Sequence, residues 1–126
     1  MKIIQTYKNI YLVEKKSKNI AQEIKDQFPN RKICVCDFYI TGSEKGEITR
    51  SGAINFDGLL LIDHHAPLPE MMRRVSSTIF ANKYVLENGP LDECYAVVIN
   101  HVDTDSILSA IIMTPLQKRE DNSYLN

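Results

Sequence analysis

Acidic and imidazole side chains gather at three places in the sequence, each directly after a run of apolar residues. They are Asp37, then Asp63, His64 and His65, then His101, Asp103 and Asp105. Carboxylates mixed with imidazoles, without thiolates, suit divalent ions such as Mn²⁺, Fe²⁺, Co²⁺ and Zn²⁺. An Asp-rich cluster can hold two ions that share one carboxylate, and two ions together activate water and clamp a phosphoryl group. These residue types predict a divalent-metal site that acts on a phosphate ester.

Each cluster also has a structural interpretation. A loop after a strand often carries Asp and His, and Asp103 and Asp105 could be the N-cap and a first-turn acid of a helix. The free N–H groups of that helix start would also favour an anion. One such cluster after an apolar run could arise by chance. Two such clusters, each after a strongly apolar run, are less easily explained by chance and favour the metal site.

The elements that must position these side chains can be read from the apolar pattern. Continuous apolar runs over 33–36, 59–62 and 96–99 are typical of strands buried on both faces of a parallel sheet, and another strand is expected within 8–14. Residues 41–58, rich in Gly, Ser and charge, indicate a loop in which a short hairpin is an open alternative. Helical spacing and capping residues predict helices over 17–28, from Ser76 or Ser77 to about Glu87, and from near Asp105 or Ser106 onward.

This alternation predicts an α/β fold with an open, mostly parallel sheet and helices on both faces. We expect one domain over residues 1–113 and a polar C-terminal tail over 114–126. In such a sheet, ligands bind at the carboxyl ends of the strands. Side chains from the three separate places would therefore meet in one crevice.

Composition narrows the range of partners. The 126 residues carry a net charge of −1 and no basic stripe, which argues against a large nucleic-acid duplex interface. No run approaches the roughly 20 apolar residues of a membrane span, and the start lacks a signal-peptide pattern, so a cytoplasmic location without a membrane partner is expected. Three cysteines, an odd number, predict free thiols, with Cys34 and Cys36 as core residues rather than zinc ligands.

Two of the clusters resemble motifs of the DHH phosphoesterase superfamily, which includes RecJ-type exonucleases, manganese-dependent pyrophosphatases and small nucleotide or oligonucleotide phosphodiesterases. The name motif is similar to 61–65 (Leu-Ile-Asp-His-His), followed by a small-residue helix start at 75–78. The family's first motif is similar to 101–110, which begins His-Val-Asp-Thr-Asp. The resemblance covers roughly residues 59–113. It implies a DHH-type α/β domain that hydrolyses a phosphoester or phosphoanhydride.

The resemblance also implies metal ligands. His101 and Asp103 would bind one Mn²⁺, while Asp105 and His64 would bind the other. Two Mn²⁺ ions are the expected cofactor, although ligand chemistry alone also allows Mg²⁺ or Co²⁺. The expected substrate is a phosphate-containing small molecule or a short oligonucleotide.

Three further roles follow from the resemblance. A bridging Asp is expected some 20–30 residues before the name motif; Asp37, 26 residues before Asp63, fits that place, and Asp57 is a weaker candidate. His65 would contact the substrate phosphate or the nucleophilic water. Asp63 would orient its neighbours as a hydrogen-bond acceptor.

The chain departs from the family pattern in three respects. The order of the two motifs is reversed, a fourth Asp motif downstream is lacking, and no length remains for the usual C-terminal substrate domain. A permuted or truncated domain is therefore expected. The alternative to an enzyme is a non-catalytic or truncated protein that binds a metal or a nucleotide. A homodimer that covers an exposed sheet edge is left open.

Overall fold

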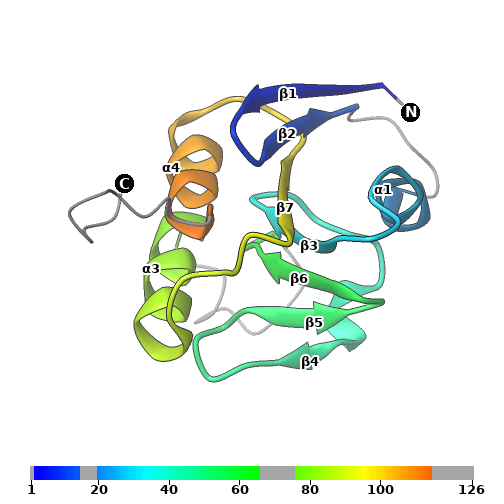
Figure 1. Ribbon diagram of the computed structural model, residues 1–126. Coiled ribbons are helices and arrows are strands. Elements are labelled where there is room, and N and C mark those ends of the chain that lie inside the picture. Colours follow the sequence, from blue (N-terminus) through cyan, green and yellow to red (C-terminus); the bar gives the residue numbers. More distant parts are fainter. Residues whose placement is uncertain (1, 15–19, 66–75, 115–126) are drawn as a thin grey trace.

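The computed structural model describes residues 2–14, 20–65 and 76–114, and within them one seven-stranded sheet is packed between helices (Figure 1). The strand order is β1-β2-β7-β3-β6-β5-β4. The strands are β1 (Ile3–Tyr7), β2 (Ile10–Val13), β3 (Lys32–Cys36), β4 (Glu47–Ile48), β5 (Ile54–Phe56), β6 (Leu59–Ile62) and β7 (Tyr95–Ile99). The helices are α1 (Ile20–Gln27), α3 (Ser77–Asn88), α4 (Thr104–Met113) and the short 3₁₀ helix η1 (Ser43–Lys45). The predicted α/β class is confirmed.

The sheet is parallel in its centre and antiparallel at both edges. Strands β2, β7, β3 and β6 run parallel, whereas β1 pairs antiparallel with β2, and β5 and β4 continue antiparallel from β6. The edge strands are joined by short connections, which permit a hairpin but not a parallel crossover. The prediction of a mostly parallel sheet therefore holds for the strands that carry the candidate site.

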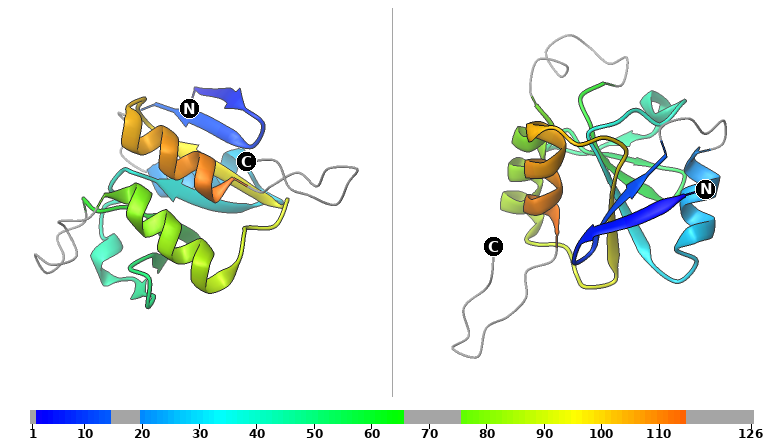
Figure 2. Two further views of the ribbon diagram at one scale, coloured as in Figure 1. Left: turned by 90° about the vertical axis from the view of Figure 1, so that its left-hand side faces the viewer. Right: turned by 90° about the horizontal axis from the view of Figure 1, so that it is seen from above.

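Helices cover both faces of the sheet, as predicted (Figure 2). On one face, α1 packs Ile24 against residues such as Val35 and Leu61. On the other face, α3 and α4 lie side by side and pack against Cys34 and Cys36. Because successive side chains of a strand point to opposite faces, burial on both faces explains the continuous apolar runs. Cys34 and Cys36 are free thiols in the core, also as predicted.

The helix ends follow the capping residues. The Ser76 side chain caps α3 by accepting a hydrogen bond from the Ile79 amide, and Gly89, at φ 77°, ends the helix. Helix α4 begins at Thr104, slightly earlier than predicted, because Asp103 is its N-cap in a capping box with Ser106. Asp103 is therefore the N-cap of a helix, as its structural interpretation predicted. The predicted start of α1 near Ser17 lies outside the described residues.

Two regions contain more regular structure than expected. Strand β1 was not predicted, because four of its five residues are exposed and no buried alternation marks it. The 41–58 segment holds η1 and the β4–β5 hairpin, so the hairpin alternative is correct. The segment with Pro67 and Pro69 and the tail over 115–126 lie outside the described residues. None of the helices in the described ranges has the length and apolarity needed to cross a membrane.

Candidate metal centre

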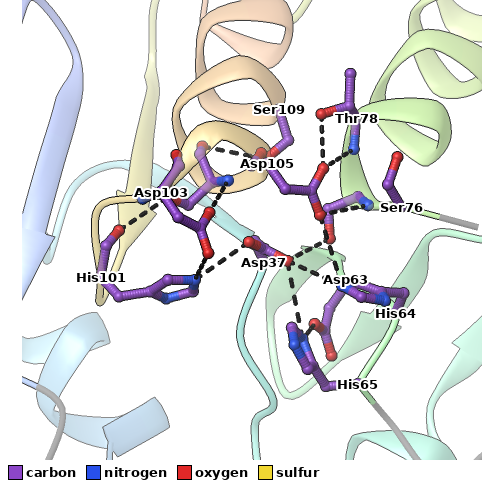
Figure 3. Close-up of polar contacts among 12 residues, drawn as sticks. Asp37, Asp63, His64, His65, Ser76, Thr78, His101, Asp103, Asp105 and Ser109 are labelled. Carbon is purple, nitrogen blue, oxygen red and sulfur yellow. Dashed lines mark hydrogen bonds and ion pairs between the residues drawn. The ribbon is translucent and has the colours of Figure 1, made fainter.

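The candidate site lies at the carboxyl ends of three neighbouring parallel strands, β7, β3 and β6 (Figure 3). Cys36 of β3 is in register with Ile62 of β6, so the residues that follow these strands, Asp37 and Asp63, leave the sheet at the same level. His101 follows β7 on the other side of β3. The predicted crevice therefore has Asp37 at its centre.

Asp37 lies between two imidazoles, one on each side. Its Oδ1 is 3.2 Å from His64 Nε2, and its Oδ2 is 3.2 Å from His101 Nε2. The residue is 2% exposed and has a φ of 63°, a conformation that Asp tolerates better than most residues. A strained backbone that aims a buried carboxylate between two imidazoles is typical of a functional site.

The His101 side of the cluster contains one further carboxylate. Asp103 Oδ2 is 3.2 Å from His101 Nε2, the same nitrogen that faces Asp37. The other ring nitrogen, Nδ1, lies 2.7 Å from the Oδ1 atom of Asn100. Because an amide oxygen only accepts, Nδ1 donates to Asn100, and Nε2 faces the two carboxylates. In this orientation Nε2 is the nitrogen that could bind a metal ion.

The His64 side of the cluster includes the remaining predicted residues. Asp105 Oδ2 is 3.5 Å from His64 Nε2. His65 Nδ1 is 3.9 Å from Asp37 Oδ1 but only 2.5 Å from Asp63 Oδ1, so its proton is donated to Asp63. All seven residues predicted from the sequence therefore meet in one cluster.

The start of α3 is bonded to two of the carboxylates. Asp105 accepts hydrogen bonds from the amides of Ser77 and Thr78 and from the Thr78 hydroxyl. The Ser77 hydroxyl, fully buried, donates to Asp37 Oδ1 at 3.0 Å. Sequence reasoning identified these residues only as a small-residue helix start, and did not predict that they position Asp37 and Asp105.

The electrostatics of the cluster favour a cation. Burial, reinforced by Asp105 and Asp103, raises the pKa of Asp37 despite the Ser77 hydrogen bond. Burial also works to raise the pKa of Asp105, but the hydrogen bonds from Thr78 and Ser77 outweigh it, and the pKa is lowered. No Lys or Arg within the described ranges forms an ion pair with these carboxylates. A divalent ion would add positive charge to these carboxylates.

Asp63 adds a buried acceptor without a donor. Its Oδ1 is occupied by His65, whereas its Oδ2 is buried and has no hydrogen-bond partner among the described residues. An unpaired carboxylate oxygen in the protein interior costs free energy, and such an atom calls for an explanation. A bound ion or water beside Asp63 would provide one.

Among residues 2–14, 20–65 and 76–114, two groups of side chains have the geometry to hold a metal ion, and Asp37 belongs to both. One is Asp37 with His64 and His65, and the other is Asp37 with His101 and Asp103; within each group the candidate ligand atoms lie within 4.8 Å of one another. Asp57, the weaker candidate for the bridging position, is not at the site. It lies in the β5–β6 turn, at the amino end of β6 and thus at the opposite end of the strands, where it pairs with Lys25 at 2.8 Å.

A pocket of about 380 Å³ opens beside the cluster. Its lining consists of Asp37, Phe38, Tyr39, His65, Asn100 and His101. This volume falls in the range of pockets that hold small molecules. A second pocket, of about 310 Å³, lies at the amino ends of the strands, where neither group of candidate metal ligands lies. The chemistry therefore belongs to the first pocket.

Comparison with known proteins leaves the site to be interpreted on its own geometry. A scan against protein-family models, a search of curated proteins and a search of solved structures each found no match to this chain.

Proposed function

We propose that this protein is a phosphoesterase of the DHH type that hydrolyses a phosphoester or phosphoanhydride with the help of two metal ions. The observation that carries the proposal is the position of Asp37, whose two oxygens face His64 and His101 at 3.2 Å each. A carboxylate held in this way suits a bridge between two ions. The similarity of 61–65 and 101–110 to the family motifs supports the same function.

The ligands divide between the two sides of Asp37. His101 and Asp103 would hold one ion, and His64 with Asp105 would hold the other. Mn²⁺ is proposed from the family resemblance, and the oxygen and nitrogen donors also suit Co²⁺ or Mg²⁺. When bound, such a pair of ions lowers the pKa of water and neutralises charge on a phosphoryl group.

His65 and Asp63 are proposed to act on the substrate. Asp63 accepts the Nδ1 proton of His65 and thereby fixes the imidazole, leaving Nε2 for the phosphate or for the attacking water. The His65 side chain is 46% exposed and lines the pocket, so a ligand can reach it. The proposed substrate is a phosphate-containing small molecule or a short oligonucleotide. A long nucleic acid is less suitable, because the pocket is small and its described lining contains no Lys or Arg to contact further phosphates.

Phosphate release from generic phosphomonoesters, phosphodiesters and pyrophosphate in the presence of Mn²⁺ tests the proposal. We expect turnover that a chelator abolishes and that His65→Ala lowers roughly 100-fold, as for loss of a general acid or base. The matched control is His65→Gln, which keeps a polar side chain but no titratable nitrogen and should be as inactive. Metal binding without turnover above background on any substrate would refute hydrolysis.

A non-catalytic protein that binds a metal and a phosphate compound is the second candidate. It is favoured by Asp105, which already accepts three hydrogen bonds from the start of α3 and has less capacity left for an ion. Tight binding of a nucleotide in the same assay, without hydrolysis, would support this candidate.

A further inference from the structure

The lining of the pocket includes two aromatic residues, Phe38 and Tyr39, which follow Asp37 in the chain. Tyr39 is 36% exposed, whereas its neighbours Phe38 and Ile40 are 5% and 2% exposed and belong to the core under α1. The alternation of buried and exposed side chains leaves Tyr39 outside the core, in the lining of the pocket that also contains Asp37 and His101. An aromatic side chain therefore stands beside the carboxylate at the centre of the site.

The Tyr39 side chain is held in place by its hydroxyl. The hydroxyl donates to the Glu44 carboxylate, at 2.7 and 2.9 Å from its two oxygens, and accepts from the Gly42 amide at 3.1 Å. Glu44 lies in η1, so the ring is fixed from its far end by the following turn. A ring held in advance loses little conformational entropy when a ligand packs against it.

Asn100 provides a hydrogen-bond donor in the same pocket. Its Oδ1 is occupied by His101 Nδ1, while its Nδ2 donates to none of the residues that the structure describes. Apart from the metal-binding and imidazole groups, the pocket thus offers an aromatic surface and an amide donor. The amide could donate to a phosphate oxygen or to an organic group, whereas the aromatic surface suits the organic part of a phosphate ester.

We infer that Tyr39 is a specificity-determining residue that binds a planar, aromatic leaving group of the substrate against its ring. The inference rests on the proposed function, because that function places the phosphate at Asp37. Aromatic groups in contact prefer offset-stacked or edge-to-face arrangements and gain free energy beyond the area they bury. Substrates with an aromatic group next to the phosphate are therefore preferred over aliphatic ones.

Two phosphonates that differ only in this group test the inference. Phenylphosphonate and methylphosphonate carry the same anionic head, and their C–P bonds withstand hydrolysis, so binding is measured separately from turnover. Calorimetric titration into the Mn²⁺-loaded protein is expected to give roughly 2- to 10-fold tighter binding of phenylphosphonate. Tyr39→Ala removes this preference.

Matched variants separate recognition from a structural role of the hydroxyl. Tyr39→Phe keeps the ring and loses the bonds to Glu44 and Gly42, and it retains most of the preference. Tyr7→Ala, which removes a 51% exposed tyrosine on β1, leaves both affinities unchanged. Thermal melting verifies that each variant is folded.

The outcomes distinguish this inference from the proposed function. Any of three results would overturn the role of Tyr39. The parent protein binds the two phosphonates equally, the preference survives Tyr39→Ala, or neither compound binds. Turnover of phosphate esters without such a preference would leave the hydrolase proposal standing alone. A preference for phenylphosphonate without hydrolysis of any ester would support the role of Tyr39 and refute catalysis.

Discussion

Asp37 combines three features that are unfavourable in a metal-free protein. Its carboxylate is buried, its backbone is in the left-handed region, and its pKa is raised by burial and by neighbouring carboxylates. Each feature costs free energy unless a compensating interaction is present. The imidazoles of His64 and His101 offset part of this cost, and a divalent ion would offset more.

The cysteines allow a test of burial at single residues. Burial, followed by the contact with Cys34, raises the pKa of Cys36 well above its ordinary value of 9.0, so little of its reactive thiolate forms. Cys94 is exposed. We predict that iodoacetamide at mildly alkaline pH labels Cys94 quickly and leaves Cys34 and Cys36 unlabelled, as followed by mass spectrometry. In guanidinium chloride all of them should react. Labelling of Cys36 in the folded protein as fast as Cys94 would contradict the structure.

At the scale of elements, the start of α3 and the start of α4 are joined through Asp105. This side chain belongs to the first turn of α4 but accepts the amides of Ser77 and Thr78 at the start of α3. It therefore stabilises one helix by charge in the first turn and the other by capping. The two helices and Asp37 are positioned together, because Ser77 also donates to Asp37.

Replacing Asp105 should destabilise the metal-free protein. Asp105→Asn is predicted to lower the free energy of unfolding by about 1–3 kcal/mol near neutral pH, because an amide nitrogen replaces one of the two oxygens that accept from Ser77 and Thr78 and leaves that donor unpaired. Because the pKa of Asp105 is lowered from 3.8 in the folded state, this stabilisation is present above that value and is lost as the pH falls through the folded pKa. Urea denaturation with a chelator, at neutral and acidic pH, measures the difference.

Asp26→Asn is the control for this prediction. Asp26 is exposed on α1 and accepts one hydrogen bond from Gln22, so its replacement should change stability by less than about 0.5 kcal/mol. An equal effect of the two substitutions, or a loss at Asp105 that does not shrink in acid, would contradict the capping role.

The loop before β5 packs closely against α3 at Gly52. Gly52 has a φ of 96°, and a Cβ atom there would lie 2.6 Å from the Phe80 ring of α3. Gly52→Ala is therefore predicted to cost about 1–3 kcal/mol of unfolding free energy through overpacking, on top of the backbone strain at this positive φ. Gly89→Ala, at φ 77° and ψ 175° with no atom within 4 Å, carries backbone strain alone, about 1–3 kcal/mol, and should cost less. Equal decreases in the melting temperatures of the two variants would rule out the contact with Phe80.

At the scale of the whole molecule, the central sheet could be predicted because its strands are buried on both faces. Runs such as 59–62 are apolar throughout, and their alternation with capped helices indicates a parallel sheet. Strand β1 could not be predicted, since its exposed side chains carry no periodic signal. The antiparallel edges depend on short connections, which the sequence revealed only as an open hairpin alternative in 41–58.

The candidate site could be predicted as residues but not as an arrangement. The carboxyl ends of parallel strands meet at one edge, which is why Asp37, Asp63 and His101 could be expected together. The sequence did not indicate that β3 lies between β7 and β6, and this order is what gives Asp37 its central position. Ser77 and Tyr39 were missed because their roles arise from contacts between segments far apart in the chain or across a turn.

Calorimetric titration of the chelator-treated protein with Mn²⁺ tests the central claim most directly, when Asp37→Asn is compared with Asp57→Asn. Both changes remove one carboxylate charge, but Asp37 lies between the two imidazoles while Asp57 pairs with Lys25 at the opposite end of the strands. We predict two ions per chain for the parent protein and for Asp57→Asn, and an affinity at least roughly 10-fold weaker for Asp37→Asn. Binding of Mn²⁺ by Asp37→Asn that equals the parent protein in number and affinity would contradict the shared-carboxylate site.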